Sequence, residues 1–547
     1  MKGGDIMNTI YIKDFVTLPC EDTAPYIRDA IKRAKEENAD CIKFEKGVYP
    51  LKSSICYETD QSAHDIGGKY TKEKAIHLLF EGLQNITICG ETDDNGEPAA
   101  LLEGFNDGKF HGILPTVFWV DGGKNITVKN LSFTRNPEYC SAGKVVKTTK
   151  KEITVEVFAG NPCFDEMGTY CMNRFTPDGN LNGESLSYGN GLNNNFKKIG
   201  DNLLVLEDER IASLVQVNDI ITFHQGAQTD FQCFFGNITN LNLENLRTIN
   251  SNGFAHLAFN IKNLKVKKVC FKPRKNQFFT APRDAFKLHK CSGNIEIDDM
   301  EIEGVRMDGQ NIHSNYIFPV EIFEDKIKFF MRSAYLPIDE NSLIEFYFGT
   351  DIKYAKVKNT EYNEKSELDG IFGHLVTVSF DGDIPKNVTR DTLCLPACWE
   401  PQSYVCRNSK FYNIAGAGQL SRIDNMIIEN CSYKNLMNSG ILLGSENPGH
   451  AEGGHATNVK ISNCSFDNCG NTARYGGMGC IGIKSGGCSD MFNHHIYISD
   501  CSFKNSDLGV GINDAHNVYI NNCTFENIKE KIRTDFSTTD KIFVDFK

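Results

Sequence analysis

Short runs of alternating apolar and polar residues recur along most of the chain, and Asn- and Gly-rich turns separate them. Runs such as "NVKISNCSF" and "NVYINNCTF" place Val, Ile and Phe on one side of an extended backbone and polar residues on the other. This period of two is typical of half-buried β-strands and not of helices. The pattern therefore predicts a chain built mainly from short strands.

The C-terminal third repeats one unit, seen as "ENCSYKN" (429–435), "SNCSFDN" (462–468), "SDCSFKN" (499–505) and "NNCTFEN" (521–527). From Phe411 onward, the aromatic residues of successive units lie 22, 33, 37 and 22 residues apart, which is too irregular for helical repeats. One unit cannot bury its apolar side alone, whereas stacked units bury a continuous core. We therefore expect an all-β fold, a right-handed parallel β-helix.

A helix and two insertions complete the expected architecture. Residues 20–40 carry an apolar stripe at helical spacing, which would cap the open end of the solenoid. Two other segments are rich in strands but lack the repeat, so we expect them to form inserted β modules beside the solenoid. The expected order is cap and first coils (1–144), first module (145–230), central coils (231–315), second module (316–400) and C-terminal coils (401–547).

Composition narrows the possible partners. The 547 residues are 40% hydrophobic and 24% charged, as in ordinary globular proteins, and the sequence has no apolar run of membrane-spanning length. The net charge of −13 is spread along the chain, which argues against nucleic acid as a partner. The N-terminus lacks the apolar core of a secretory signal, so we expect a cytoplasmic protein. The oligomeric state is open, and a homodimer is one possibility.

The 20 cysteines do not suggest a disulfide framework. Cys431, Cys464, Cys501 and Cys523 each follow an Asn or Asp at the same point of the repeat. We expect them to be reduced thiols that stack in the core, in place of disulfides or metal ligands.

Two aspartates are candidates for paired acid and base catalysis. Asp284 in "PRDAFKLHKCSG" and Asp308 in "MDGQNIH" are 24 residues apart, about one coil at the shortest repeat. Neighbouring coils stack about 4.8 Å apart, so carboxyl groups that lean apart would approach the ~6.5–9.5 Å separation of an inverting glycosidase. The alternative is that Asp308 and Asn311 only satisfy a turn.

Two further features have both a functional and a structural interpretation. "HAEGGH" holds His450, Glu452 and His455, but its glycines deny the helical face of zinc-hydrolase motifs. We therefore expect no metal and no cofactor, and interpret the segment as a polar loop over a sugar or a solvated turn. Trp399 would either stack on a sugar ring or belong to the core.

At these stretches the sequence resembles glycoside hydrolase family 110, the inverting exo-α-1,3-galactosidases with a right-handed β-helix. The segment around Glu446 and Glu452 also aligns with the family, as does "WEPQSYV" (399–405). The matching motif positions are Asp284, Ala285, Cys291 and Gly293 in the first stretch and Glu303, Gly304, Asp308, Asn311 and His313 in the second.

The resemblance implies an exo-acting hydrolase that removes a terminal α-linked sugar, galactose or a relative, from an oligosaccharide or glycoside. We expect Asp284 to be the acid, Asp308 the base, and Glu452 to position the sugar or replace one of them. The expected substrate-binding residues are Asn311, His313, Glu446 and Trp399.

One position departs from the family pattern. Where the family has paired aspartates, this sequence has Met307 before Asp308. A thioether cannot accept a proton from water, so the base role rests on Asp308, moves to Glu446 or Glu452, or is lost. Two alternatives follow: a sugar-binding β-helix without catalysis, and a polysaccharide lyase or epimerase. The mostly acidic candidate site argues against the second.

Overall fold

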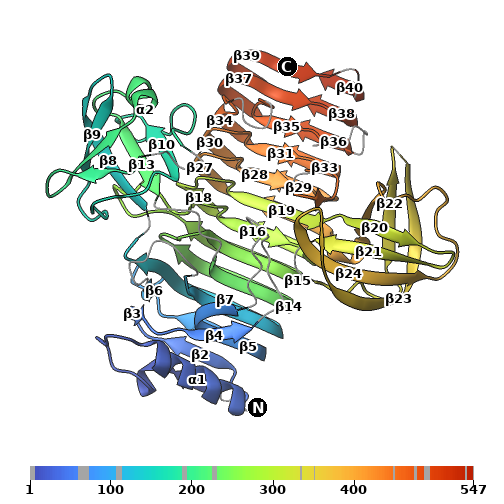
Figure 1. Cartoon of the computed structure of the whole chain (residues 1–547), viewed down its shortest axis with the longest axis horizontal. Coiled ribbons are helices and arrows are strands. Elements are labelled where there is room, and N and C mark those ends of the chain that lie inside the picture. Colours follow the sequence, from blue (N-terminus) through green and yellow to red (C-terminus); the bar gives the residue numbers. More distant parts are fainter. Residues whose placement is uncertain are drawn as a thin grey trace, which may run out of the picture.

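The computed structural model describes residues 7–58, 73–105, 114–138, 140–187, 194–224, 231–332, 335–349, 351–446, 450–472, 477–485, 493–535, 537 and 539–545. Most of them form strands of a parallel β-helix that runs from the N-terminus to the C-terminus, with a smaller β unit on each side (Figure 1). The predicted fold class is therefore confirmed.

Each coil of the C-terminal half has up to three strands, which we call faces A, B and C in chain order. Strands of one face pair in parallel between successive coils. Face A comprises β16 (Phe286–His289), β19 (Gln310–Asn315), β28 (Gln419–Ser421), β31 (Ile441–Leu443) and β35 (Ile481–Ile483). Face B comprises β17 (Ser292–Asp298), β26 (Pro401–Arg407), β29 (Met426–Glu429), β33 (Thr457–Ser462), β36 (Asn493–Ser499), β38 (Ala515–Asn521) and β40 (Thr539–Asp545). Face C comprises β18 (Glu301–Glu303), β27 (Lys410–Ile414), β30 (Ser432–Leu436), β34 (Ser465–Cys469), β37 (Ser502–Ile512) and β39 (Thr524–Thr534).

In the N-terminal half, longer strands bend around the corners between faces. They are β5 (Glu73–Gly90), β7 (Thr116–Asn136), β14 (Phe231–Thr248) and β15 (Phe254–Phe271). Asparagines occupy the corners because this side chain tolerates the left-handed backbone conformation. Asn237 and Asn260 have φ of 54° and 51°, and Nδ2 of Asn260 donates to Oδ1 of Asn237 at 2.8 Å. Stacked amides thus explain the recurrent Asn turns.

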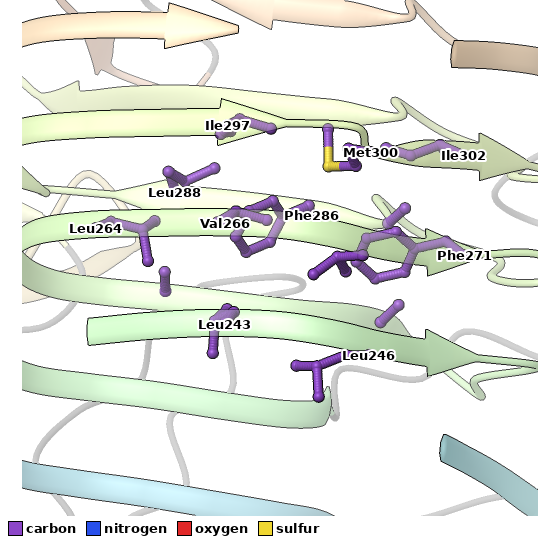
Figure 2. Close-up of a cluster of buried hydrophobic side chains, with 14 of the residues drawn as sticks. Leu243, Leu246, Leu264, Val266, Phe271, Phe286, Leu288, Ile297, Met300 and Ile302 are labelled. Carbon is purple, nitrogen blue, oxygen red and sulfur yellow. The ribbon is translucent and has the colours of Figure 1, made fainter. Parts of the chain in front are cut away.

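The repeated aromatic residues form a ladder inside the solenoid. Phe411 stacks on Tyr433 and Tyr433 on Phe466 with ring centroids 4.9 Å and 4.8 Å apart, close to the spacing between strands. The next rings, Phe503 and Phe525, continue it at 5.1 Å and 4.9 Å. Aliphatic side chains from successive coils fill the interior in the same layered way (Figure 2).

The repeated cysteines lie in the same core as free thiols, as predicted. Cys431, Cys464, Cys501 and Cys523 are all buried, and each lies beside backbone carbonyls of its own coil and of the preceding coil. The contact with Cys406 lowers the pKa of Cys431, but the contact with Cys464 and burial raise it more, to about 12. Such buried thiols behave as small apolar side chains.

The predicted N-terminal cap is confirmed as α1 (Ala24–Glu36). It buries Ala24, Ile27, Ala30, Ile31 and Ala34 against the first strands. Those strands are β1 (Thr9–Tyr11), β2 (Cys41–Phe44), β3 (Gly47–Leu51), β4 (Ile55–Glu58) and β6 (Ala100–Phe105). Across the part of the chain that the structure describes, no helix is long and apolar enough to cross a membrane.

The sequence predicts two inserted modules at 145–230 and 316–400, of which residues 188–193, 225–230, 333–334 and 350 lie outside the described residues. The first module is a six-stranded sheet with a short helix: β8 (Cys140–Thr148), β9 (Glu152–Val157), β10 (Cys171–Phe175), β11 (Lys197–Lys198), β12 (Leu203–Glu207), α2 (Glu209–Leu214) and β13 (Ile220–His224). The second is a closed barrel: β20 (Ile317–Ile322), β21 (Lys326–Arg332), β22 (Leu343–Phe348), β23 (Asp351–Leu368), β24 (Ile371–Phe380) and β25 (Leu393–Pro396). Both stand beside the solenoid (Figure 1).

Candidate active site

Most predicted site residues lie on or next to the outer surface of face A, around strands β16 and β19. Phe286 of β16 points into the core (Figure 2). Because side chains alternate along a strand, Lys287 and His289 point outward. In-register pairing places Asn311 beside Lys287 and His313 beside His289. The structure therefore brings Asn311 and His313 together on one surface.

Asp284 and Asp308 lie on successive coils just before these strands. The N–H of Ala285 donates to the carbonyl of Asp308 at 3.1 Å, which aligns the two coils. One carboxylate oxygen of Asp284 accepts from the N–H of Asp308 at 3.4 Å, and the other accepts from Nδ2 of Asn311 at 3.3 Å. Oδ1 of Asp308 accepts from the N–H of Ala417 on the next coil at 2.7 Å. Both aspartates are 2% exposed.

A third carboxylate, Glu452, reaches the same surface from a distant segment. Its short strand β32 (Glu452–Gly453) pairs antiparallel with the end of β19, where Glu452 faces Asn315. Oε1 of Glu452 lies 3.4 Å from Nζ of Lys287 and 3.2 Å from Nε2 of His313. Oε2 lies 2.8 Å from Nη1 of Arg422. Glu452 is therefore held by basic groups from three coils.

Burial raises the pKa of Asp284 above its usual range, and the opposing effect of Lys287 and Arg283 is smaller. A carboxyl group in this environment keeps its proton to a higher pH than an exposed aspartate. Asp284 therefore has the character of a proton donor.

Glu452 behaves in the opposite way. Burial on its own raises its pKa, but His313, Arg422 and Lys287 together outweigh burial and hold the pKa of Glu452 well below its usual value. Burial also lowers the pKa of His313 to about 3, while Glu452 beside it acts in the opposite direction. Arg422 and Lys287 are the other two basic groups in contact with Glu452.

Arg422 connects the acidic residues into one network. Its Nη1 donates to Oδ1 of Asn311 at 3.2 Å, and its Nη2 donates to Oε2 of Glu446 at 3.0 Å. Since Asn311 also donates to Asp284, the contacts run from Asp284 through Asn311 and Arg422 to Glu446 and Glu452. The side chain of Glu446 is 35% exposed, so it forms the open rim of an otherwise buried cluster.

Trp399 does not lie in this cluster. It is 1% exposed and belongs to the apolar core between the solenoid and the barrel. Nζ of Lys290 lies 4.4 Å from the centre of its ring system, and Nε1 donates to the carbonyl of Pro337 at 3.3 Å. The predicted stacking of Trp399 on a sugar does not fit this position, because the side chain is buried and Lys290 already lies against its ring.

The histidines of "HAEGGH" point to different partners. His450 lies 3.9 Å from Glu446, whereas His455 lies 3.5 Å from Asp424 and 3.2 Å from the hydroxyl of Tyr347 in the barrel. Within the described ranges, no group of three or more His, Cys, Asp and Glu side chains is arranged to hold a metal ion.

Sequence reasoning missed the basic residues of the site. The sequence suggested a mostly acidic site, and the structure adds Lys287 and Arg422, which contact the carboxylates directly. The alternating pattern after Asp284 contained a signal for Lys287, because it is the first outward position of that strand. Arg422 carried no local signal, since it lies 111 residues after Asn311.

Three comparisons with known proteins extend this description. A family model described as a right-handed β-helix region matches residues 397–539. Two curated relatives are each named α-1,3-galactosidase B. The one from Bacteroides thetaiotaomicron is 22% identical over 330 residues, covering 56% of this chain and 50% of the relative. The one from Akkermansia muciniphila is 21% identical over 468 residues, covering 79% and 54%. The chain thus spans about half the length of the curated relatives it matches.

Solved structures with similar architecture are also found. The A-module of a mannuronan C-5 epimerase from Azotobacter vinelandii matches with a TM-score of 0.43 and 9% identity, covering 97% of this chain and 99% of that one. A family 28 exopolygalacturonase from Yersinia enterocolitica matches with a TM-score of 0.43 and 10% identity, covering 99% of this chain and 79% of that one.

Proposed function

We propose that this chain is an exo-acting glycoside hydrolase that releases a terminal α-linked sugar, galactose or a close relative, with inversion. The observation that carries the proposal is the pair of buried carboxyl groups, Asp284 and Asp308, on successive coils beside a hydrogen-bonding surface. The names of the two curated relatives support the sugar and the α linkage. Since this chain matches only about half of each relative, its activity and its substrate are both proposed here.

In an inverting hydrolysis, one carboxylic acid protonates the leaving oxygen while a carboxylate removes a proton from the attacking water. The raised pKa of Asp284 suits the acid. Asp308 is then the base, and the N–H of Ala417 fixes the direction of its carboxylate. The bond from the sugar carbon to the leaving oxygen breaks as water adds from the opposite side, so the α-linked substrate gives a β-anomer.

The surrounding side chains position the sugar in this proposal. Glu452 stays ionised and presents a fixed acceptor to ring hydroxyls, since Arg422 and Lys287 hold it. Asn311 and His313 lie beside it and contribute further hydrogen-bonding groups. Glu446 contacts the sugar from the rim of the cluster.

Met307 is half-buried, and its carbonyl accepts from the N–H of Gly416 at 3.0 Å. Its thioether contributes no carboxylate, so the base role rests on Asp308. Three carboxyl groups, Asp284, Asp308 and Glu452, nevertheless gather here, which favours an altered glycosidase over one that has lost catalysis.

A test of the proposal combines aryl α- and β-glycosides with α-1,3-linked disaccharides and follows the first-formed anomer by NMR. We expect α-glycoside hydrolysis with the β-anomer appearing first. A first-formed α-anomer contradicts inversion. If no glycoside is hydrolysed but calorimetry shows micromolar sugar binding, the chain is a binding protein that lacks catalysis.

The role of Asp308 has its own variant. Asp308→Asn should abolish turnover while leaving the melting temperature nearly unchanged. Asp298→Asn is the matched control: Asp298 accepts from Asn408 at 2.7 Å on face B, away from the cluster, and its variant should keep full activity. Full activity in Asp308→Asn removes Asp308 from the mechanism.

The basic residues of the site favour a second candidate, a lyase or epimerase that acts on polyuronates. Such enzymes need positive charge near the substrate carboxylate, and Lys287 and Arg422 supply it. Both cations are already paired with Glu452, so this candidate stands second. Ultraviolet absorbance of an unsaturated product, or exchange of the C5 hydrogen with solvent, would establish it.

A further inference from the structure

A cavity of about 510 Å³ lies between the solenoid and the first module, and its lining residues are distinct from those of the carboxyl cluster. Its solenoid wall comprises Glu103 of β6, residues 135–138 at the end of β7, and Arg274 in the turn after β15. Its module wall is the loop after β9, which contributes Pro162 and Phe164. Small-molecule sites have cavities of about 300–1,000 Å³, so this cavity is large enough for a sugar unit.

Two buried residues of opposite charge form a fixed part of the wall. Glu138 is 8% exposed: its Oε1 accepts from Nδ2 of Asn250 at 2.8 Å, and its Oε2 accepts from Nε2 of Gln277 at 2.7 Å. Arg135 is 1% exposed, and its Nε donates to Oε1 of Gln232 at 2.6 Å. Partners from the two following coils therefore hold both charged groups in place without a ligand, which is the pre-organisation that a binding site needs.

Other polar side chains of the wall are more open. The side chain of Arg274 is 46% exposed, and its Nη1 lies 3.2 Å from Oε1 of Glu138. A guanidinium has five N–H donors, so this contact leaves donors for a ligand. Glu103 is half-buried, and its Oε1 accepts from Nδ2 of Asn136 at 3.2 Å. A carboxylate has about four acceptor positions, so Glu103 can also accept from a ligand.

The charges of the wall favour an uncharged ligand. Two arginines and two glutamates line the cavity, so their formal charges cancel. Half-buried Phe164 and Pro162 add apolar surface beside these polar groups. A sugar unit presents hydroxyls and C–H groups together, so it suits a wall of this mixed kind.

The cavity lies on the Asp284 side of the two catalytic carboxyl groups. Thr248 of β14 pairs with Phe133 of β7 and with Phe271 of β15, so these three strands end in register. Asp284 follows β15, and the wall at the end of β7 therefore lies two coils before it, roughly 9–10 Å along the solenoid. Asp308 lies one coil beyond Asp284, in the opposite direction. Because the acid protonates the leaving oxygen, the leaving glycan lies on the side of Asp284.

We propose that this cavity is a second sugar-binding site, which holds a remote unit of the leaving glycan when the substrate is longer than a disaccharide. In this site Arg274 donates to one hydroxyl of that unit, Glu103 accepts from another, and Phe164 packs against its C–H groups. The inference rests on the proposed glycosidase function and adds a preference for oligosaccharides over disaccharides.

Arg274→Ala tests the site with two substrates that share the cleaved bond. We expect KM for an α-1,3-galactosyl-terminated tetrasaccharide to rise about tenfold with kcat unchanged, because the cavity contributes binding and no chemistry. Both constants for α-1,3-linked galactobiose should stay within about twofold, since its single leaving sugar lies beside Asp284. Equal rises in KM for both substrates, or an unchanged KM for the tetrasaccharide, would overturn the site.

Glu103→Ala repeats the test at a second residue of the wall. It leaves the exposed Asn136 free to bond to water, so the fold should not suffer, and it should raise the tetrasaccharide KM in the same way.

Lys272→Ala is the matched control. The side chain of Lys272 is 43% exposed and lies 2.8 Å from a carboxylate oxygen of Glu301, so it resembles Arg274 in exposure and pairing but does not belong to the cavity lining. This variant should keep the wild-type KM for the tetrasaccharide. A rise as large as that of Arg274→Ala would overturn the assignment.

Binding separates this inference from the proposed function. If the wild-type chain hydrolyses neither substrate, the glycosidase proposal fails, and calorimetric titration with the tetrasaccharide then judges the site. Weaker binding in Arg274→Ala than in the wild type and Lys272→Ala supports it. Equal binding in all three, or no binding to the wild type, overturns it.

Discussion

The outward-facing side chains of face A differ sharply in polarity from those of the N-terminal strands β7, β14 and β15 that continue its row of paired strands. One in-register row runs through Trp119, Phe234, Leu257, Lys287, Asn311, Leu420 and Leu442. In the N-terminal coils the row is apolar: Trp119 stacks on Phe234 at 3.9 Å, and both join the core of the barrel. At Lys287 and Asn311 the row is polar and meets Glu452, and at Leu420 and Leu442 it is apolar again.

The difference shows how one backbone serves two purposes. Both parts share the same parallel pairing, so backbone geometry alone does not distinguish them. The apolar part gains stability by burying its side chains under the barrel. The polar part buries charged groups at a cost that hydrogen bonds and ion pairs only partly offset, as is common at functional sites.

The largest expected effect comes from removing the acid of the polar part. Asp284→Asn should lower kcat/KM for disaccharides by about 10²–10⁴-fold, the usual contribution of a general acid. The loss on α-galactosyl fluoride should be far smaller, because fluoride leaves without protonation. Equal losses on both substrates would show that Asp284 binds the sugar and does not donate a proton.

Next in size is the contrast in stability between the two parts. Glu452→Gln removes the carboxylate that Lys287 and Arg422 share, which leaves Arg422 paired with the more exposed Glu446, and should lower the free energy of unfolding by about 3–5 kcal/mol at neutral pH. Trp119→Ala, in the apolar part, should cost about 3–5 kcal/mol by leaving a cavity. Urea unfolding measures both.

The pH dependence of those two costs distinguishes them. The folded-state pKa of Glu452 is lowered, so its contribution is present above the unfolded value of about 4.3 and is lost as pH falls through the folded value. The cost of Trp119→Ala should not vary with pH. A Glu452→Gln cost that persists in acid would show that its charge does not stabilise the fold.

A moderate effect is expected in the pH profile of activity. The folded-state pKa of Asp284 is raised, so kcat/KM should fall as pH rises through it, and this limb should be absent in Asp284→Asn. Ionisation of the buried group above the unfolded pKa of about 3.9 costs stability, so Asp284→Asn should also melt at a higher temperature at neutral pH. A lower melting temperature would show that the carboxylate is stabilised where it lies.

The smallest effect should come from restoring the family's paired aspartates. Met307 is half-buried and precedes the buried Asp308, so Met307→Asp should lower the free energy of unfolding by about 1 kcal/mol. Turnover should change less than tenfold if Asp308 is the base. A gain above a hundredfold would show that the wild-type site lacks its base.

Much of the solenoid could be predicted because its signals are local. The period-two pattern, the Asn turns and the repeated aromatic residues each act within one coil, and in-register stacking copies them from coil to coil. The pairing of Asp284 with Asp308 follows from the same rule, since one short coil separates them. The sequence could not decide between sugar stacking and core packing for Trp399, because an aromatic side chain suits both environments.

The sequence by itself determined the β-helix, its cap and the coil that joins the two aspartates, since short-range alternation and turn chemistry specify them. Only the tertiary structure decided which charges meet those aspartates. The barrel separates Asn311 from Arg422 along the chain while face A keeps them adjacent, and Glu452 arrives on an antiparallel strand outside the repeat. Contacts of this kind depend on long-range register, which no local pattern records.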